Sequence, residues 1–301
     1  MKLYRYLHGQ SPTLGVQVGD HLYNCARLFE EAGQQPPDVV LRADVRSICA
    51  APDSVLIFLQ QFLKDVKPAA APNAELAVPL ASARLLAPLP NPEKVVCIGL
   101  NYLDHCEEQN RPRPSHPMLF AKFANTIAGP TDDVTIPTNT QELDYEGELA
   151  FIIGKGGRNI AEADALKHIF GYMVMLDVSA RDLQRTDGQW VRAKSQDGFA
   201  PCGPCIVTAD EIPDPQVLGI ETRVNGETLQ KSNTSNMIFP IAHLVSFISQ
   251  SLTLAPGDIV TTGTPAGVGV HRNPQVLLKD GDVVEVTLDH IGTLRNRFVG
   301  P

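Results

Sequence analysis

The 301-residue sequence predicts an α+β protein with mixed sheets, and three observations support this prediction. Hydrophobic residues make up 43% of the chain, which is enough for one sizeable core and a smaller domain. Short apolar segments bounded by Gly, Pro, Asn and Asp indicate many strands and hairpins. Helical segments alternate with these strands too irregularly for a doubly wound parallel sheet.

Residues 1–85 are expected to form a small N-terminal α+β domain. The segment LGVQVGDHLYNC predicts a hairpin that turns at Gly19-Asp20. The segment DSVLIFLQQFLKDV has the spacing of an amphipathic helix, with Asp53 or Ser54 as its cap. Six prolines in residues 67–92 then favour a domain boundary or an extended crossover between about 80 and 92.

Residues 93–301 are predicted to form the larger domain. KVVCIGLNY at its start predicts a strand that runs into a loop, and Asn225-Gly226 predicts a hairpin turn. PIAHLVSFISQSL is typical of a helix, and the turn APGD precedes a further strand, IVTTG. A last hairpin is expected around residues 290–292.

The charge and the cysteine pattern exclude several classes of protein. The net charge is −9, the isoelectric point is about 5.3, and no basic run is interleaved with aromatics, so we expect no nucleic-acid partner. No apolar run approaches the roughly 18 residues of a membrane span, and the first residues lack a signal peptide, so we expect no membrane partner and a cytoplasmic location. The scattered cysteines indicate reduced thiols rather than a disulfide framework.

The segment QELDYEGELAFII carries an acid at every second position: Glu142, Asp144, Glu146 and Glu148. Side chains two apart on a strand share one face, so the four acids are expected together. Glu146 and Glu148 lie closest to the apolar run that follows, where uncompensated carboxylates would be costly to bury. Three kinds of compensation remain open: Arg or Lys from elsewhere in the fold, protonation of one acid, or a divalent cation.

A further acid, Asp177, ends the apolar strand predicted in GYMVMLDVSARDLQ. Ser179 and Asp182 have the spacing of a capping box for the next helix. If this strand neighbours the acidic one, the three carboxylates would form a site suited to Mg²⁺ or Mn²⁺. The alternative is that Asp177 only caps the helix.

Four polar residues form pairs at helical spacing, and a fifth lies in a loop. Arg181 and Gln184 are three apart, which suits the gripping of a substrate carboxylate or oxo group but also suits a surface. His105 and Glu108 are also three apart, so a helical turn would pair an imidazole with a carboxylate and hold the ring for proton transfer. Lys194 lies in a loop of ambiguous structure.

Two local motifs resemble known sites. TTGTPAGVG at 261–269 is a glycine-rich turn whose exposed amides could cradle an anion, although it lacks the lysine and spacing of a nucleotide P-loop. CGPC at 202–205 matches a redox C-x-x-C motif. The residues after it indicate a strand rather than the helix that would lower the first thiol's pKa, so redox chemistry is not expected.

In their order and spacing, six motifs over about residues 93–300 resemble the fumarylacetoacetate hydrolase family. The motifs are IGLNYLDH with a following Glu, LDYEGELAFIIGK, GYMVMLDVSARDLQ, AKSQDGFAPCGP, TSNMIF and GDIVTTGTPAGVG. The resemblance implies a β-rich, roll-like catalytic domain of mixed sheets beside the small N-terminal domain, and a homodimer.

The resemblance also implies roles for nine residues of this chain. It assigns Mg²⁺ binding, with Mn²⁺ or Ca²⁺ as alternatives, to Glu146, Glu148 and Asp177. It assigns substrate binding to Arg181 and Gln184 and charge stabilisation during catalysis to Lys194. It assigns the binding of a substrate carboxylate to Thr264. It makes His105 and Glu108 an acid/base dyad on a mobile lid.

Three further positions follow from the same comparison. Glu142 and Asp144 are expected nearer the rim of the site. Some family members carry a fourth acidic ligand just before the lid, where this sequence has Asn101. Water would then complete the coordination shell.

The implied substrate is a small 2-oxo acid whose enolate a bound cation stabilises. The leading prediction is hydrolysis of a C–C bond in a β-diketo acid of the acylpyruvate or fumarylpyruvate type, with the His105/Glu108 dyad activating water. The alternatives on the same site are 2-hydroxyhepta-2,4-diene-1,7-dioate isomerisation or tautomerisation, and oxaloacetate decarboxylation. A non-catalytic binding protein is the alternative from another class.

Overall fold

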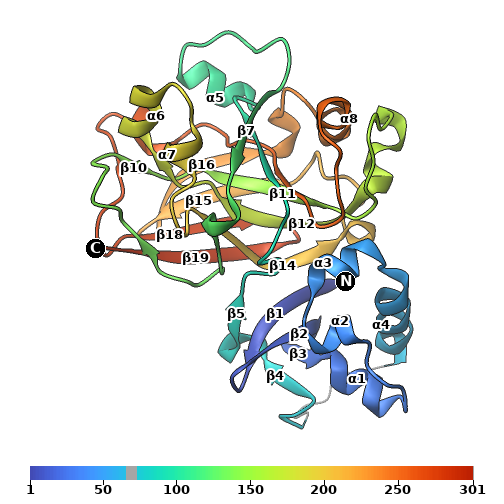
Figure 1. Cartoon of the computed structure of the whole chain (residues 1–301). Helices are drawn as coiled ribbons and strands as arrows, with labels where there is room; N and C mark the ends of the chain where they lie inside the picture. Colours follow the sequence, from blue (N-terminus) through green and yellow to red (C-terminus); the bar gives the residue numbers. More distant parts are fainter. Residues whose placement is uncertain (66–72, 301) are drawn as a thin grey trace.

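The structure is a computed structural model that describes residues 1–65 and 73–300. Figure 1 shows the N-terminal strands and helices, in blue and cyan, gathered at one end of the molecule. The helix α5 (Leu103–Glu108) lies at the opposite end, above the strands of the larger part. No helix among the described residues has both the length and the apolar character of a membrane span.

One mixed sheet runs through both parts and contains twelve strands of the described chain. Its order is β4-β3-β2-β1-β14-β12-β11-β17-β6-β7, with β5 beside β1 and β8 beside β14. The strands are β1 (Lys2–His8), β2 (Ser11–Val18), β3 (His21–Asn24), β4 (Ala77–Pro79), β5 (Arg84–Leu86), β6 (Val95–Gly99), β7 (Met118–Lys122), β8 (Ile127–Ala128), β11 (Gly147–Ile153), β12 (Ile169–Leu176), β14 (Ala200–Thr208) and β17 (Ile259–Thr261). Because β1 pairs antiparallel with β14, the N-terminal part is hydrogen-bonded directly to the larger part.

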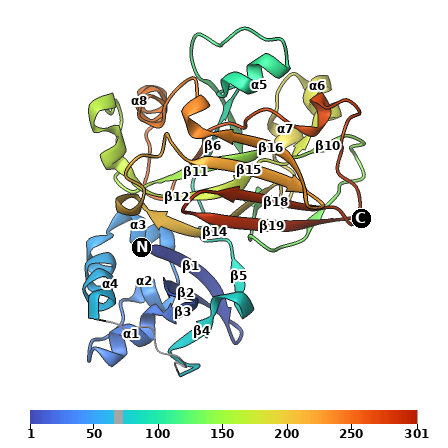
Figure 2. The same cartoon turned by 180° about the vertical axis from the view of Figure 1, so that it is seen from behind.

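A second sheet has the order β16-β15-β18-β19-β9, and β10 pairs with β13 apart from it. Figure 2 shows β15, β18 and β19 side by side. The strands are β9 (Val134–Thr135), β10 (Leu143–Asp144), β13 (Ser179–Ala180), β15 (Gly219–Val224), β16 (Glu227–Asn233), β18 (Val283–Leu288) and β19 (Gly292–Val299).

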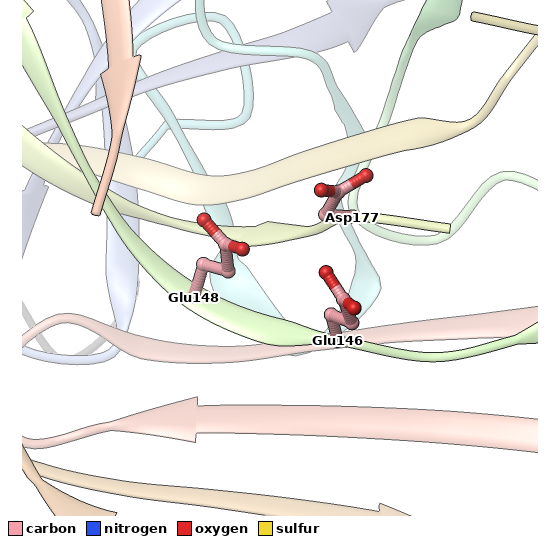
Figure 3. A group of neighbouring side chains, drawn as sticks. All are labelled: Glu146, Glu148 and Asp177. Atoms are coloured by element: carbon pink, nitrogen blue, oxygen red, sulfur yellow. The ribbon is translucent and has the colours of Figure 1, made fainter. Parts of the chain in front are cut away.

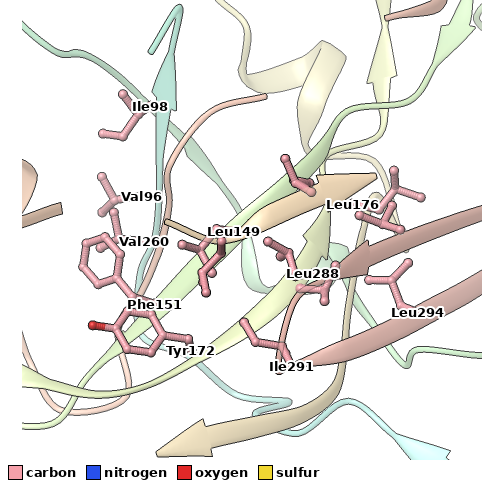
Figure 4. Close-up of a cluster of buried hydrophobic side chains, with 14 of the residues drawn as sticks. Val96, Ile98, Leu149, Phe151, Tyr172, Leu176, Val260, Leu288, Ile291 and Leu294 are labelled. Atoms are coloured by element: carbon pink, nitrogen blue, oxygen red, sulfur yellow. The ribbon is translucent and has the colours of Figure 1, made fainter. Parts of the chain in front are cut away.

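The main hydrophobic core lies between the two sheets. Figure 4 shows Leu149, Phe151 and Leu176 of the first sheet meeting Leu288 and Leu294 of the second. All five side chains are almost fully buried. Burying a side chain of this size stabilises the fold by about 1.5 to 3 kcal/mol. The core therefore fixes β11 and β12, the strands that carry the acidic motifs.

The helices lie around the sheets and at their ends. In the N-terminal part they are α1 (Cys25–Glu31), α2 (Asp38–Leu41), α3 (Val45–Ala50) and α4 (Asp53–Asp65). In the larger part they are α5, α6 (Arg181–Asp187), α7 (Val191–Lys194) and α8 (Ile241–Ser251). Short 3₁₀ helices are Leu80–Ser82, Ala124–Thr126, Glu162–His168, Ala209–Glu211, Thr234–Asn236 and Gly269–His271.

The predicted α+β class is confirmed, as are the predicted hairpins and longer helices. The chain turns at Gly19-Asp20 between β2 and β3, and at Asn225-Gly226 between β15 and β16. Asn225 and Gly226 have φ values of 52° and 84°, the positive values that a two-residue turn between twisted strands requires. The helices α4 and α8 occupy the segments predicted for them, and α4 begins at Asp53.

Two local predictions are wrong. The acidic segment is not one strand, because the chain leaves β10 at Asp144 and enters β11 at Gly147. Nor do Ser179 and Asp182 form a capping box. The Ser179 hydroxyl donates to the Asp177 carbonyl, Asp182 accepts from the Thr140 hydroxyl, and no side chain caps α6.

The division into residues 1–85 and 93–301 remains a prediction. β5 still pairs with β1 of the N-terminal part, and β6 begins the larger part at Val95. The first predicted domain thus ends inside β5, and the second begins in the connection just before β6.

Candidate active site

Three buried carboxylates meet where β11 begins and β12 ends. β11 and β12 are antiparallel neighbours with Gly147 opposite Leu176, so Asp177 lies across from Glu146. An oxygen of each of Glu146, Glu148 and Asp177 lies within 4.8 Å of the other two. Figure 3 shows the three side chains gathered together, the two glutamates rising from the same stretch of ribbon. The strands are therefore neighbours, which was the condition for a three-carboxylate site.

Three cations surround these carboxylates. Lys194 Nζ lies 2.7 Å from Glu146 Oε2 and 2.8 Å from Asp177 Oδ2. Lys122 Nζ donates to Asp177 Oδ1 at 2.6 Å, and a guanidinium nitrogen of Arg181 lies 2.6 Å from Glu146 Oε1. Lys122 was missed in the sequence. The only signal for it is a lysine that ends an otherwise apolar strand segment, MLFAK.

The two glutamates have opposite pKa shifts. Burial acts to raise the pKa of Glu146, but the charges of Lys194 and Arg181 outweigh it and hold that pKa well below its ordinary value. Burial, reinforced by Asp177 and Glu146, holds the pKa of Glu148 well above its ordinary value. Of the three kinds of compensation left open by the sequence, the fold thus uses cationic side chains for Glu146 and favours protonation for Glu148.

The carboxylate triad also fits a divalent cation. Mg²⁺, Mn²⁺ and Ca²⁺ prefer oxygen ligands, and the triad offers carboxylate oxygens from three residues. Oxygens that share such a cation at about 2.0 to 2.6 Å lie within roughly 4 to 5 Å of one another. The observed spacing meets that requirement.

Asp144 does not lie at the rim, contrary to expectation. Its buried carboxylate accepts from Arg181 Nε at 2.8 Å and from the backbone N–H groups of Gly269 and Val270. Arg181 in turn donates to Gln184 Oε1 at 3.0 Å, so the two side chains share the helix face that their spacing predicted. Asp144 therefore supports Arg181 from behind the site.

Glu142 occupies the outer position predicted for it. Its carboxylate accepts two bonds from Arg185 at 2.7 Å, and its side chain is 29% exposed. This pair lies nearer the solvent than the triad.

The glycine-rich segment at 261–269 does cradle anions, but the anions are carboxylates of the protein itself. Gly263 N donates to Glu148 Oε2 at 3.0 Å, and Gly267 N donates to Glu108 Oε2 at 2.8 Å. Thr264, from the same segment, is nearly buried and lines the cavity described below. The segment thus connects the triad to the helix α5.

His105 and Glu108 are paired on α5, as predicted. His105 Nδ1 lies 2.5 Å from Glu108 Oε1, and the Gln109 amide lies 2.7 Å from His105 Nε2. With Gln109 donating to Nε2, the proton of the neutral ring lies on Nδ1 and points to Glu108. Nε2 is then the basic atom of the ring.

A cavity of about 270 Å³ lies between α5 and the triad. Seven of the predicted site residues line it: His105, Glu146, Glu148, Arg181, Gln184, Lys194 and Thr264. Glu108 and Asp177 lie behind this lining. Phe120 and Trp190, which the sequence did not single out, form an apolar wall with ring centroids 5.3 Å apart. Arg111 and His271 also line the cavity.

Two other sequence candidates lie outside the site. The Asn101 amide is buried and bonds to the carbonyls of Phe239 and Thr262, so its side chain is committed to backbone groups. Cys202 and Cys205 lie in β14, the strand predicted for them. Burial raises the pKa of Cys202 to about 12 and that of Cys205 to about 11, which opposes thiolate chemistry.

Comparison with known proteins gives consistent matches. Residues 94–299 match the family described as fumarylacetoacetate (FAA) hydrolase C-terminal. A Xenopus laevis protein named oxaloacetate tautomerase fahd2, mitochondrial, is 53% identical over 217 residues, which cover 71% of this chain and 68% of the relative.

Solved structures match over the whole chain. A putative HpcE protein from Mycobacterium smegmatis has a TM-score of 0.81 and 36% identity, covering 100% of this chain and 99% of that one. Maleylpyruvate hydrolase from Sphingobium sp. SYK-6, solved with manganese(II) and pyruvate, has a TM-score of 0.78 and 29% identity, again covering 100% and 99%.

Proposed function

Because the chain belongs to the fumarylacetoacetate hydrolase family, we propose that it is a divalent-cation-dependent enzyme that interconverts the keto and enol forms of a small 2-oxo acid. Oxaloacetate is the leading substrate, since the 53% identical relative is named an oxaloacetate tautomerase. The observation that carries the proposal is the buried carboxylate triad facing His105 across one small cavity.

Glu146, Glu148 and Asp177 would hold the cation, Mg²⁺ or Mn²⁺, with Ca²⁺ as the alternative. Bound there, it would supply Lewis-acid stabilisation of negative charge on the substrate's oxygens. The manganese in the related maleylpyruvate hydrolase supports this part of the proposal.

The cationic and polar lining would bind the substrate. Lys194 and Arg181 place two buried positive charges beside the triad, where the enolate's charge develops. Gln184 is held against Arg181 and also lines the cavity. Thr264 offers a hydroxyl to the substrate carboxylate.

His105 would move the proton. Its Nε2 takes a proton from the carbon next to the 2-oxo group, and that C–H electron pair passes into the new C=C bond of the enolate. The C=O π pair moves onto the oxygen, and the proton held on His105 passes to that oxygen to complete the enol. Glu108 keeps the Nδ1 proton directed toward itself and stabilises the charged ring. Gln109 must release Nε2 before the ring can act.

The second candidate function is hydrolysis of a C–C bond in an acylpyruvate or fumarylpyruvate. This reaction was the leading prediction from the sequence. The His105–Glu108 pair that favours it is suited to activating a water molecule. A structural relative named maleylpyruvate hydrolase supports it. Oxaloacetate decarboxylation is the third candidate reaction, and the assays described below also test it.

The test uses metal-stripped protein with and without Mg²⁺ or Mn²⁺, assayed on oxaloacetate, acetylpyruvate and fumarylpyruvate. We expect cation-dependent enolisation of oxaloacetate that falls about 100-fold or more in His105→Ala and in Glu146→Ala. Glu107→Ala, an exposed position on the same helix as His105, is the matched control. Cleavage of an acylpyruvate without enolisation would favour the second candidate. Cation binding without any turnover would reject catalysis.

The homodimer and the cytoplasmic location are also proposals. Sedimentation velocity tests the first, and cell fractionation tests the second. The frog relative's name assigns that protein to mitochondria, so mitochondrial recovery is the contrary outcome for the location.

A further inference from the structure

Gln230 lies on β16 and is fully buried behind the cavity. Its Oε1 accepts from the backbone N–H of Gly147 at 3.0 Å. Its Nε2 donates to Thr264 Oγ1 and to the Pro265 carbonyl, both at 2.8 Å. The side chain therefore bridges the strand that carries the two glutamates and the segment that carries Thr264.

The orientation of this amide follows from its partners. A backbone N–H can only donate, and the Pro265 carbonyl can only accept. The oxygen of Gln230 must therefore face Gly147, and its nitrogen must face Thr264 and Pro265.

This orientation decides where the Thr264 hydroxyl proton points. Thr264 Oγ1 already receives a proton from Gln230, so its own single proton must go elsewhere. It has two directions: the Gly147 carbonyl, 3.0 Å away, or an oxygen of a molecule in the cavity that Thr264 lines. A hydroxyl that accepts a hydrogen bond is polarised into a stronger donor.

Gly147 has no room to move away from this bridge. A Cβ at this position would lie 2.2 Å from Thr222 Oγ1 and 2.9 Å from Val286 Cγ1. Gln230 thus holds a tightly packed peptide between Glu146 and Glu148 and at the same time orients Thr264.

We propose that Gln230 is a positioning residue that makes Thr264 a hydrogen-bond donor to the carboxylate of a bound 2-oxo acid. The inference rests on the proposed function, because it assumes that such an acid enters the cavity. Gln230 acts through Thr264 and does not itself line the cavity.

A double-mutant cycle tests it, with pyruvate as the probe in the presence of Mg²⁺. The dissociation constant is measured by calorimetry and by the fluorescence of Trp190, the single tryptophan of the chain, which lines the same cavity. We expect Gln230→Met and Thr264→Val each to weaken pyruvate binding about tenfold to a hundredfold. The double variant should bind no more weakly than Thr264→Val alone, because the two residues act as one unit.

A matched control is Gln216→Met, which also removes a glutamine amide bonded to backbone groups, those of Thr234 and Ile241. It should lower the melting temperature without changing the pyruvate affinity. If Gln230→Met does not fold, Gln230→Glu replaces it in the cycle. Its carboxylate still accepts from Gly147 but cannot donate to Thr264, so the same loss is expected.

The experiment distinguishes failure of the proposed function from failure of the inference about Gln230. If wild-type protein with Mg²⁺ binds no pyruvate, the proposed function fails and the inference fails with it. If wild-type protein binds pyruvate but the losses from Gln230 and Thr264 multiply in the double variant, only the inference is overturned. Gln230 would then have a general structural role.

Discussion

Glu146 and Glu148 are two residues apart, yet their surroundings drive their pKa values in opposite directions. Lys194 and Arg181 lie against Glu146 and favour its charged form. Glu148 is buried beside two other acids, and the backbone N–H of Gly263 donates a hydrogen bond to it. A cation entering the triad would therefore act chiefly on the charge of Glu148.

The first prediction concerns pH and Glu148 in metal-free protein. Its folded-state pKa lies above the ordinary value of 4.5, so above that pH the unfolded chain releases the proton while the folded chain keeps it. The free energy of unfolding contributed by this group is therefore highest at low pH and falls as pH rises, by about 1.4 kcal/mol per pH unit at most. Glu148→Gln should remove this slope.

The measurement is chemical denaturation of both proteins at a series of pH values above 4.5, with and without Mg²⁺. Mg²⁺ should stabilise the wild type increasingly as pH rises, and should stabilise the variant little. Equal pH slopes in the two metal-free proteins would contradict the assignment.

The second prediction concerns the packing of Gly147. Gly147→Ala should lower the free energy of unfolding by about 1 to 3 kcal/mol, because the new methyl group meets Thr222 and Val286 in a closed space. Denaturation curves measure the loss. Thr222→Ala removes the nearest atom and should restore part of it, and no interaction between the two changes would argue against the clash.

At the scale of elements, α5 is fastened to the rest of the site by two carboxylates one helical turn apart. Asp104 accepts from the Ser232 hydroxyl at 2.6 Å and from Ala266 N at 3.4 Å. Glu108 accepts from Gly267 N at 2.8 Å. The helix that carries His105 is thus held against β16 and the glycine-rich segment by a few hydrogen bonds.

The third prediction follows from this attachment. Asp104→Ala removes the contact to Ser232 and the bond to the backbone N–H of His105, so α5 should be held less firmly, by about 1 to 2 kcal/mol. Limited proteolysis between α5 and β7 should become several-fold faster, and kcat/KM should fall. Glu107→Ala, at an exposed position of the same helix, is the control and should change neither.

Patterns with a strong local cause were predictable at this scale. The hairpin at Asn225-Gly226, the helix α8 and the strand that ends just before Asp177 depend on turn chemistry and on apolar spacing. The pairing of His105 with Glu108 depends on one helical turn. These features need no knowledge of distant residues.

Where a feature depends on residues far away in the sequence, the prediction from the sequence either omitted it or was wrong. The acidic segment breaks at Tyr145 because Asp144 turns to bind Arg181 and the N–H of Gly269, far away in the sequence. Lys122 and Gln230 reach the site from strands that carry no catalytic motif. No local pattern distinguishes such residues from ordinary strand residues.

At the scale of the whole molecule, the six cysteines are dispersed through both parts and all are buried as free thiols. Burial raises the pKa of each, to about 11 for Cys205 and about 12 for Cys202. The fold therefore protects its thiols from the reactions that need a thiolate.

The fourth prediction is a thiol titration with an aromatic disulfide reagent near pH 7.5. Native protein should react slowly and incompletely, and unfolded protein should show all six thiols. Rapid reaction of Cys202 or Cys205 in native protein would reopen the redox hypothesis for CGPC.

Because β1 pairs with β14, the first strand of the chain can complete its pairing only late in synthesis. Leu3 lies opposite Ile206, so about 200 residues must be added before β1 meets its partner, which takes about 10 to 40 s at the usual rates of translation. Until then Lys2 and Leu3, at the start of β1, have unpaired N–H and C=O groups on one edge, because β5 covers that edge only from Arg5 to Leu7. We expect a ribosome-bound nascent chain to recruit chaperones to this segment until β14 emerges.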